Sequence, residues 1–443
     1  MNKYDNQNNS VLDLFSRPKG VSRIWLYGNY FMRYRSSDFI MKTVMVIPSY
    51  WSREKSVGWK KQDAIYDHPT PLDEQGTLKR MLESINVLEN KDFDLIILAV
   101  PTNEEISNQV QEKVTDIVSS VSLDLNISVI GSSHIEQVKE YLNQSGKKDL
   151  ARLISINGYS NIRNLCLFLP AIKDADVAIL IDDDEVFTDP LYLSKALEHI
   201  KNPFDDRLQY AIAGYYVNSD GNYQVNSSFS SWMKFWDKKE KMNEAFDQII
   251  GKSPRMKITP FVFGGNMIIP KEVFSTIMFD PYVPRGEDID YLINARMHNI
   301  PFYLDNQLFI VHLPPSKSHP TWQRLREDIF RFMYERKKIH CQKGKKTVVQ
   351  PEDLDPYPGC FLKKDLDDKI KKANDKLAEE YRLKGDHQGE KQALNNIKLA
   401  ESEAIPKFDP VDRYERLRNQ WMELIRMIQN PSVKKKLEDI IDQ

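Results

Sequence analysis

Cysteine is scarce in this sequence, and no apolar run is long enough to cross a membrane as a helix. The three cysteines, Cys166, Cys341 and Cys360, stand far apart in a chain of 443 residues. An odd number without close spacing argues against a disulfide framework or a zinc site and favours a reducing compartment. The polar N-terminus is unlike a signal peptide. We therefore expect a cytoplasmic protein without a transmembrane segment.

An excess of basic residues is also missing. Lysine and arginine together number 62 and aspartate and glutamate 64, which gives a formal net charge of -2. A general nucleic-acid binder needs a basic surplus, so no nucleic-acid partner is expected. Internal repeats and long low-complexity segments are lacking too, whereas 41% hydrophobic residues suffice for a sizeable core.

The most informative segment present is Val177–Glu185. A short apolar run, typical of a buried strand, is followed at once by three aspartates and a glutamate, Asp182 to Glu185. Open α/β sheets bind ligands at the carboxyl ends of their strands. Neighbouring carboxylates repel one another unless a cation or solvent relieves them, and oxygen ligands suit Mg²⁺ or Mn²⁺. A solvated acidic loop before a helix at Asp189-Pro190 is the alternative that this segment alone leaves open.

Apolar periodicity predicts an α/β fold. Strand and helix patterns alternate from residue 44 to about 200, as in a parallel sheet flanked by helices. The expected strands cover 44–47 (ended by Pro48), 94–100, 126–130 and 177–181, and a helix is expected over 160–172. The second half adds strands at 210–217, 261–269, 301–304 and 308–312, a helix over 287–299, and a Trp-rich cleft wall around Trp232 and Trp236.

Three regions follow from these patterns. Residues 1–40 are an expected arm, 41–320 the main domain, and 321–443 a C-terminal helical extension that packs on the main domain or on a second copy in a homo-oligomer. The polar segment 49–71 is long for a loop and is expected to act as a lid or acceptor-site element. Within it, Asp67-His68 is expected in a surface turn before Pro69, with reach into the site as the alternative.

Four sequence features occur in an order that is informative about the family. They are Ile47-Pro48-Ser49, Ile162-Arg163-Asn164, Asp182-Asp183-Asp184, and a late group that comprises Gly264-Gly265-Asn266, Arg285 to Asp290, and Val311-His312. Over residues 42–314 this set resembles nucleotide-sugar glycosyltransferases of GT-A fold, especially glycosyltransferase family 2. The resemblance implies a GT-A, Rossmann-like, mostly parallel central sheet.

The resemblance also implies a hexosyltransferase activity and a role for each motif. A nucleotide-diphosphate sugar would be bound by Pro48, Ser49, Arg163, Asp182, Asp183 and Gly265. A divalent Mg²⁺ or Mn²⁺ would be held by Asp184, His312 and Asp182. Asp288 would take the proton of an acceptor hydroxyl, and Glu287 would contact the acceptor. An acidic residue that commonly recognises the base in this family is missing after the 94–100 strand, so the base is not predicted.

Each motif has a structural alternative. Arg163 suits a surface helix, Glu287 and Asp288 suit a first helical turn, His312 suits a strand end, and Gly264-Gly265 suits a bulge. The helix start at Glu287-Asp288 favours inversion, but retaining enzymes of the glucosylglycerate or mannosylglycerate synthase type carry the same parts. A nucleotidylyltransferase is disfavoured because Ser49 to Arg53 contains no glycine. A non-catalytic sugar-nucleotide-binding protein is the third alternative.

Overall fold

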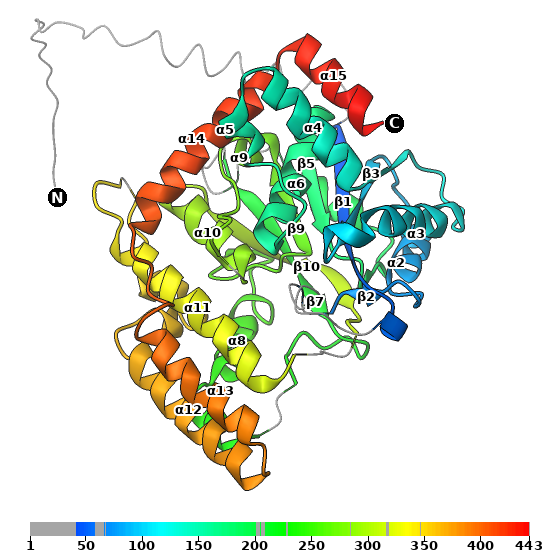
Figure 1. Ribbon diagram of the computed structural model, residues 1–443. Helices are drawn as coiled ribbons and strands as arrows, with labels where there is room; N and C mark the ends of the chain where they lie inside the picture. The colour runs from blue at the N-terminus through cyan, green and yellow to red at the C-terminus, as the bar shows by residue number, and fades with distance from the viewer. Residues whose placement is uncertain are drawn as a thin grey trace, which may run out of the picture. The chain divides into compact units, whose positions relative to one another are not determined.

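The computed structural model describes residues 41–57, 66, 68–200, 204, 209–226, 229–283, 285–315, 319–345 and 347–442. The expected arm at 1–40 lies outside the described residues. Lys42–Gln443 forms one compact unit around a central sheet (Figure 1). Among the helices described in this unit, none is long and apolar enough to span a membrane.

The sheet contains ten strands within the described residues. They are β1 (Thr43–Ser52), β2 (Thr70–Pro71), β3 (Asp94–Pro101), β4 (Ile127–Ile130), β5 (Val177–Ile181), β6 (Glu185–Val186), β7 (Ala211–Val217), β8 (Met256–Ile258), β9 (Asn266–Pro270) and β10 (Phe302–His312). Their order is β4-β3-β1-β5-β9-β7-β10-β6, with β2 beside β1 and β8 beside β10.

Most neighbouring strands run parallel. β4, β3, β1 and β5 are parallel to one another, as are β7 and β10, whereas β9 is antiparallel to both β5 and β7. Every residue of β5 is buried, which explains its unbroken apolar sequence. The carboxyl ends of β1 and β5 therefore meet at one edge, and the predicted mostly parallel α/β sheet is confirmed.

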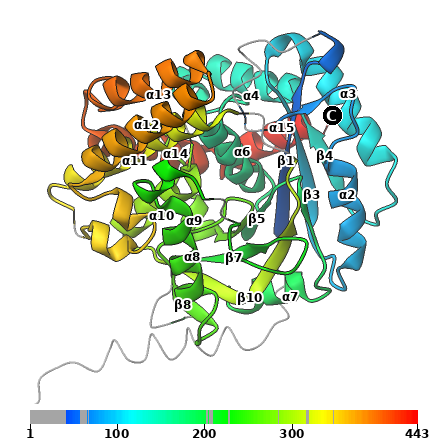
Figure 2. The ribbon, with the colours of Figure 1, turned by 90° about the horizontal axis from the view of Figure 1, so that it is seen from below.

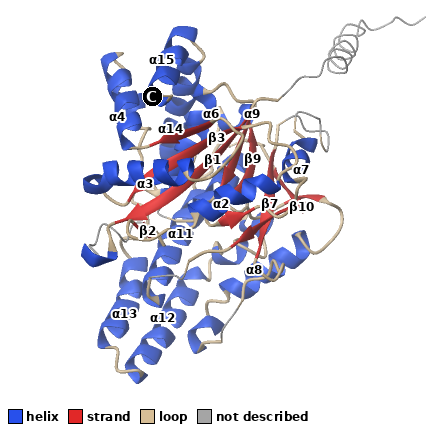
Figure 3. Ribbon diagram, turned by 90° about the vertical axis from the view of Figure 1, so that its right-hand side faces the viewer, coloured by secondary structure: helices blue, strands red, loops and turns tan. Residues whose placement is uncertain are grey.

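Helices flank the sheet on both faces (Figure 3). They are α2 (Leu78–Ser84), α3 (Ser107–Ser119), α4 (Ser132–Gln144), α5 (Lys148–Ala151), α6 (Tyr159–Ile172), α7 (Tyr192–Glu198), α8 (Lys238–Ile249), α9 (Lys271–Phe274), α10 (Glu287–Met297), α11 (Thr321–His340), α12 (Leu366–Leu383), α13 (His387–Ala400), α14 (Pro410–Ile428) and α15 (Pro431–Ile441). α6 packs on β1 and β5, and α14 and α15 pack on α6. α12 and α13 run side by side at the edge of the unit (Figure 2).

Three strands differ from the predicted ones by more than one residue. β1 continues through Pro48 because, beyond Val46, β5 no longer pairs with it, so a proline without an N–H is tolerated at that open side. β9 begins only at Asn266, whose N–H closes a turn on the carbonyl of Phe263 at 2.9 Å. The two short strands predicted near the end are one strand, β10, with a register shift between Leu304 and Phe309.

A buried ion cluster joins α11 to α10 and to the segment before it. The Lys338 ammonium on α11, which has no exposed surface, donates to Asp280 at 2.8 Å, to Asp290 at 2.6 Å and to Asn294 at 3.1 Å. Asp280 and Asp290 are themselves at most 1% exposed. Since Asp290 belongs to α10, this cluster fixes α11 against the helix that begins with Glu287.

Replacing this lysine tests the cluster. In Lys338→Met, two buried carboxylates lose their cation, which we expect to lower the free energy of unfolding by about 3–5 kcal/mol. Urea unfolding followed by circular dichroism measures the loss. The matched control is Lys371→Met, which removes an exposed i,i+4 pair with Asp375 and should leave the free energy of unfolding almost unchanged. Equal stabilities of the two variants would contradict a structural role for Lys338.

Candidate active site

A cleft of about 1050 Å³ lies over the carboxyl ends of β1 and β5. Its floor carries Asp182, Asp183 and Asp184 from the segment that follows β5. One wall is the start of α10 and part of α11, and another carries Trp232 and Trp236, as the sequence predicts. The predicted site motifs, which are distant in the chain, therefore meet in one place.

Arg163 on α6 is paired with the first of these acids. Its Nη1 lies 2.8 Å from Oδ1 of Asp182, and its Nη2 donates to Oδ2 at 3.0 Å. Its Nε lies 3.5 Å from Oε1 of Glu287. Arg163 is 4% exposed, which rules out the surface-cation alternative. Burial opposes its charge, but Asp182 first and Glu287 with it raise the pKa of this guanidinium well above its ordinary value.

Asn164, next to Arg163, has a structural role. Its amide donates to the carbonyl of Phe279 at 2.9 Å and accepts the N–H of the same residue at 2.8 Å. These two bonds fasten α6 to the chain that leads to α10. The rotation of α6 about its axis is thereby fixed, and with it the direction in which Arg163 points.

Asp183 is held by the end of β1. The Ser49 hydroxyl donates to its Oδ2 at 2.6 Å, and the Trp51 indole donates to the same hydroxyl at 2.9 Å. Burial, and then repulsion by Asp184, raise the pKa of Asp183 to about 7, although the Ser49 hydrogen bond opposes the rise. Ser49 therefore reaches the site through Asp183.

Asp184 lies between two imidazoles. Nε2 of His312, at the end of β10, and Nε2 of His68, before β2, are each 3.3 Å from Oδ2 of Asp184. Burial would raise the pKa of this carboxyl, but the two imidazoles outweigh burial and hold it well below its usual range. The His312 ring stacks on Tyr216 with centroids 4.6 Å apart. Asp184 is thus an ionised carboxylate with two nitrogen atoms beside one oxygen.

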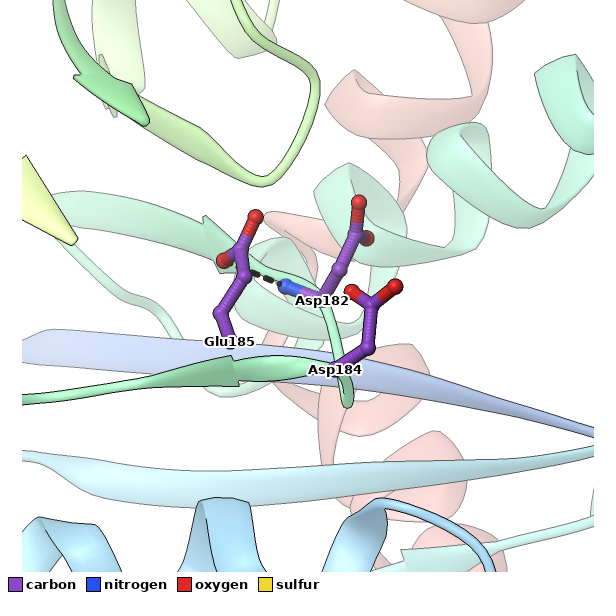
Figure 4. Close-up of side chains that lie close together, drawn as sticks. All are labelled: Asp182, Asp184 and Glu185. Atoms are coloured by element: carbon purple, nitrogen blue, oxygen red, sulfur yellow. Dashed lines mark hydrogen bonds between the residues drawn. The ribbon is translucent and has the colours of Figure 1, made fainter. Parts of the chain in front are cut away.

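The same turn offers a donor set that fits a divalent cation. One oxygen each of Asp182, Asp184 and Glu185 lie within 4.8 Å of one another. Figure 4 shows the three carboxylates extending to the same side of the turn, and Glu185 also accepts the backbone N–H of Asp182 at 2.9 Å. Glu185 has no exposed surface, and burial followed by the charges of Asp182 and Asp184 raises its pKa well above the ordinary value. Glu185 therefore shapes the turn through its hydrogen bond to Asp182 and also offers an oxygen to the same cluster of donors.

Gly264 and Gly265 face this cluster with their backbone. A Cβ on Gly264 would lie 2.9 Å from Nη2 of Arg163, and one on Gly265 would lie 2.2 Å from Oε1 of Glu185 and 2.7 Å from Oδ2 of Asp182. The Gly265 N–H also donates to the Tyr216 hydroxyl at 2.7 Å. These glycines are required because the acidic turn and Arg163 occupy the space of a side chain.

The acid pair opens α10 at the cleft wall. Gly286 is its N-cap, with φ of 72°, a conformation that favours glycine, and a Cβ there would lie 2.4 Å from Arg331 of α11. Glu287 is 8% exposed and turned toward Arg163, and burial followed by the Asp288 charge raises the pKa of its carboxyl. Asp288 is half-buried and accepts the N–H of Ile289 at 2.8 Å.

Most predicted site residues converge, and some unpredicted ones join them. Pro48 lies within β1, opposite Leu98, and does not line the cleft. His68 lies beside Asp184, so the alternative that it reaches into the site holds and the preferred surface turn does not. Arg331 was not singled out by the sequence. Asp67 lies outside the described residues.

Asp183 should make stability depend on pH. Its ordinary pKa is 3.8 but rises to about 7 in the folded protein. Between these values the unfolded chain has lost a proton that the folded chain keeps, so folding stability falls with rising pH by up to about 1.4 kcal/mol per unit. Asp183→Asn retains a partner for Ser49 and removes this titration. Urea unfolding in EDTA measures the free energy of unfolding of both proteins at about pH 5 and pH 7.5. The value for Asp183→Asn minus that for the parent protein should be larger at pH 7.5 than at pH 5. The same difference at both pH values would contradict the raised pKa.

Comparison with known proteins gives structural neighbours alone. No family model matches the chain, and no curated protein matches it. A mannosyltransferase from Pyrobaculum calidifontis, solved with GDP-Man and Mn²⁺, shares 11% identity over 92% of this chain and 94% of its own, with a TM-score of 0.41.

Two further solved structures are of the same kind. GalNAc-T7, solved with UDP, GalNAc and Mn²⁺, is 11% identical over 68% of this chain and 51% of its own, with a TM-score of 0.35. Glucosyl-3-phosphoglycerate synthase from Mycobacterium tuberculosis, solved with Mn²⁺ and UDP-Glc, is 9% identical over 68% and 78%, with a TM-score of 0.34. At these scores the neighbours assign neither family nor activity to this chain.

Proposed function

We propose that this chain is a metal-dependent glycosyltransferase that moves a sugar from a nucleotide-diphosphate sugar to an acceptor hydroxyl, with inversion. The observation that carries the proposal is the meeting of two acidic centres in one cleft. Asp182 and Asp184 form one centre, Glu287 and Asp288 the other, and Arg163 contacts both through Asp182 and Glu287. Such a cleft can hold a cation-bound leaving group at one end and activate a hydroxyl at the other.

The first centre would bind the donor. Asp184, His312 and Asp182 would hold a divalent ion, which when bound neutralises charge on the departing diphosphate. Asp182 shares its carboxylate with Arg163, so it is held in place before any donor arrives. Arg163 in turn adds a fixed positive charge beside the leaving group and limits the repulsion between the acids.

The second centre would activate the acceptor. Asp288 suits the base because it is half-buried and lines the cleft, whereas the carboxylate of Glu287 is buried and turned toward Arg163. Asp288 takes the proton of the acceptor hydroxyl, and the oxygen forms a bond with the anomeric carbon. The bond from that carbon to the diphosphate breaks, and the diphosphate leaves with the electron pair. Direct displacement of this kind inverts the anomeric configuration.

Variants at both centres test the proposal. Asp288→Asn keeps the shape but removes the base, so the rate of transfer should fall by about 10²–10⁴-fold. Asp184→Asn should abolish the dependence of the rate on Mn²⁺ or Mg²⁺. The control is Asp149→Asn, an exposed acid on α5 outside the cleft, which should retain full activity. Release of UDP or GDP from the corresponding sugar nucleotides, with and without acceptor alcohols, gives the rates, and NMR of the product gives its anomeric configuration.

Other results would direct the assignment elsewhere. Full activity in both folded cleft variants would contradict the proposal. A product that retains the donor configuration would still be consistent with the proposed donor site. It would, however, contradict the assignment of Asp288 as the base of a direct displacement. Pyrophosphate release from a nucleoside triphosphate would indicate a nucleotidylyltransferase, and tight donor binding without turnover would indicate a binding protein.

Ligand binding provides a test that does not depend on the acceptor. A ligand that binds the folded state stabilises it and so raises the melting temperature. The free energy of unfolding increases by about 2.7 kcal/mol when the ligand concentration is a hundred times its dissociation constant. We expect UDP, GDP or their sugars to raise the melting temperature only when Mn²⁺ or Mg²⁺ is present. Asp184→Asn should lose this effect. A rise of equal size in EDTA would argue against a metal-bound diphosphate.

A further inference from the structure

We infer that the acceptor carries a phosphate or carboxylate group besides its hydroxyl, and that Arg324 and Lys239 bind this anionic group. The inference deepens the proposed function and rests on it, because it names the class of acceptor that enters the same cleft. Arg324 is on α11 and Lys239 is at the start of α8, and both side chains are half-buried and line the cleft.

Arg324 and Lys239 differ from the other cations that line the cleft away from solvent. Within the described residues, neither forms an ion pair. Nη2 of Arg324 lies 3.5 Å from the Thr321 hydroxyl, the buried Nε of Arg324 has no hydrogen-bond partner there, and Lys239 donates to the carbonyl of Asn226 at 2.9 Å. The positive charges of Arg324 and Lys239 are therefore left for a ligand to neutralise. Each of the other cations pairs with a carboxylate: Arg163 with Asp182, Lys238 with Asp328, Arg285 with Glu327, and Arg331 with Glu335.

The fold brings the two unpaired charges to one wall of the cleft. The ion pair between Lys238 and Asp328 joins the start of α8 to α11. Lys239 follows Lys238 in the chain, and Arg324 precedes Asp328 by four residues, so Arg324 lies on the same face of α11, one turn away. Burial, and then the charge of Arg324, lower the pKa of the Lys239 ammonium. An anion bound beside both side chains would relieve this repulsion.

The two side chains suit an oxyanion. A guanidinium offers its N–H groups in a planar fork that matches the oxygens of phosphate or carboxylate, and an ammonium adds a second charged donor. Two acids at the start of α8, Asp237 and Glu240, also line the cleft, but in the part of the chain that the structure describes they form no ion pair with either cation. This wall therefore favours a negatively charged group over a neutral one.

The position of Arg324 along α11 relates the anionic group to the proposed base. Arg331, seven residues further along α11, packs so closely on Gly286 that a Cβ there would lie 2.4 Å from its side chain. Gly286 caps α10, the helix that begins with Glu287 and Asp288. Seven residues of helix span about 10 Å. An acceptor that extends over about this length would place its hydroxyl at Asp288 and its anionic group at Arg324.

Binding of inorganic phosphate to the full chain tests the inference. Isothermal titration calorimetry in EDTA at low ionic strength gives the dissociation constant under conditions in which no metal ion attracts phosphate to the acidic turn. We expect Arg324→Gln and Lys239→Gln to bind phosphate at least about tenfold more weakly than the parent protein, and Arg324→Lys to retain part of the affinity. Acetate in the same titration distinguishes a carboxylate site from a phosphate site.

A second measurement compares acceptors. Glucose, glucose 6-phosphate and glucuronate differ in charge, and release of UDP or GDP from the sugar nucleotides gives the rate with each. The parent protein should prefer a charged acceptor to glucose, and Arg324→Gln should lose that preference through a higher KM. Equal use of glucose and both charged acceptors by the parent protein would contradict the inference.

The control is Arg152→Gln, which changes an arginine outside the cleft whose side chain is 79% exposed and should leave the phosphate affinity unchanged. Circular dichroism and the melting temperature in EDTA show which variants fold, and Lys239→Gln tests the site if Arg324→Gln does not fold. Phosphate affinity equal to that of the parent protein in the folded variants would overturn the inference, as would a parent protein that binds neither phosphate nor acetate. Failure of the proposed function would be visible separately, as Arg324-dependent phosphate binding without sugar transfer.

Discussion

The contact between Arg163 and Asp182 is the interaction on which the cleft depends. A buried guanidinium, held by two oxygens of one acid and lying beside a second acid, lets carboxylates from β5 and α10 share a small volume. Remove its charge and the remaining groups repel one another in a setting where water cannot screen them. The position of Arg163 is fixed in turn by Asn164 on α6 and by the missing side chain of Gly264.

The acids of the turn divide into two kinds. Burial favours the neutral forms of Asp183 and Glu185, whereas Asp184 is ionised because imidazoles lie beside it. The turn thus concentrates negative charge on Asp184 and reduces it on Asp183, which also lines the cleft, and on the buried Glu185. This division explains how four consecutive acidic residues fit at the end of one strand.

The sequence predicted the sheet and most of the site because the signals were local. The apolar run of β5, its acidic end and the acids at the start of α10 are each read within ten residues. His68 was named only as an alternative and Arg331 not at all, because their contacts join segments remote in the chain. The end of β1 was predicted too early, at Pro48. A proline ends a strand only where its missing N–H is needed by a neighbouring strand, and β5 no longer pairs with β1 at that point. The sequence drew attention to Gly264-Gly265. The reason that glycine is needed there, crowding by Arg163 and Glu185, can be seen only in the structure.

The buried cluster at Lys338 has a consequence for how this chain can diverge. The lysine lies on α11, whereas its carboxylate partners lie in and before α10, the helix that starts at the cleft wall. Replacing any one of these charged side chains leaves an unpaired charge in the protein interior. Substitutions in the cluster are therefore expected to occur together. Relatives that retain all three charged residues should keep the packing of α10 against α11. Relatives that replace one of the three should also replace the other two. In this sense α11 belongs to the structure that supports the cleft wall.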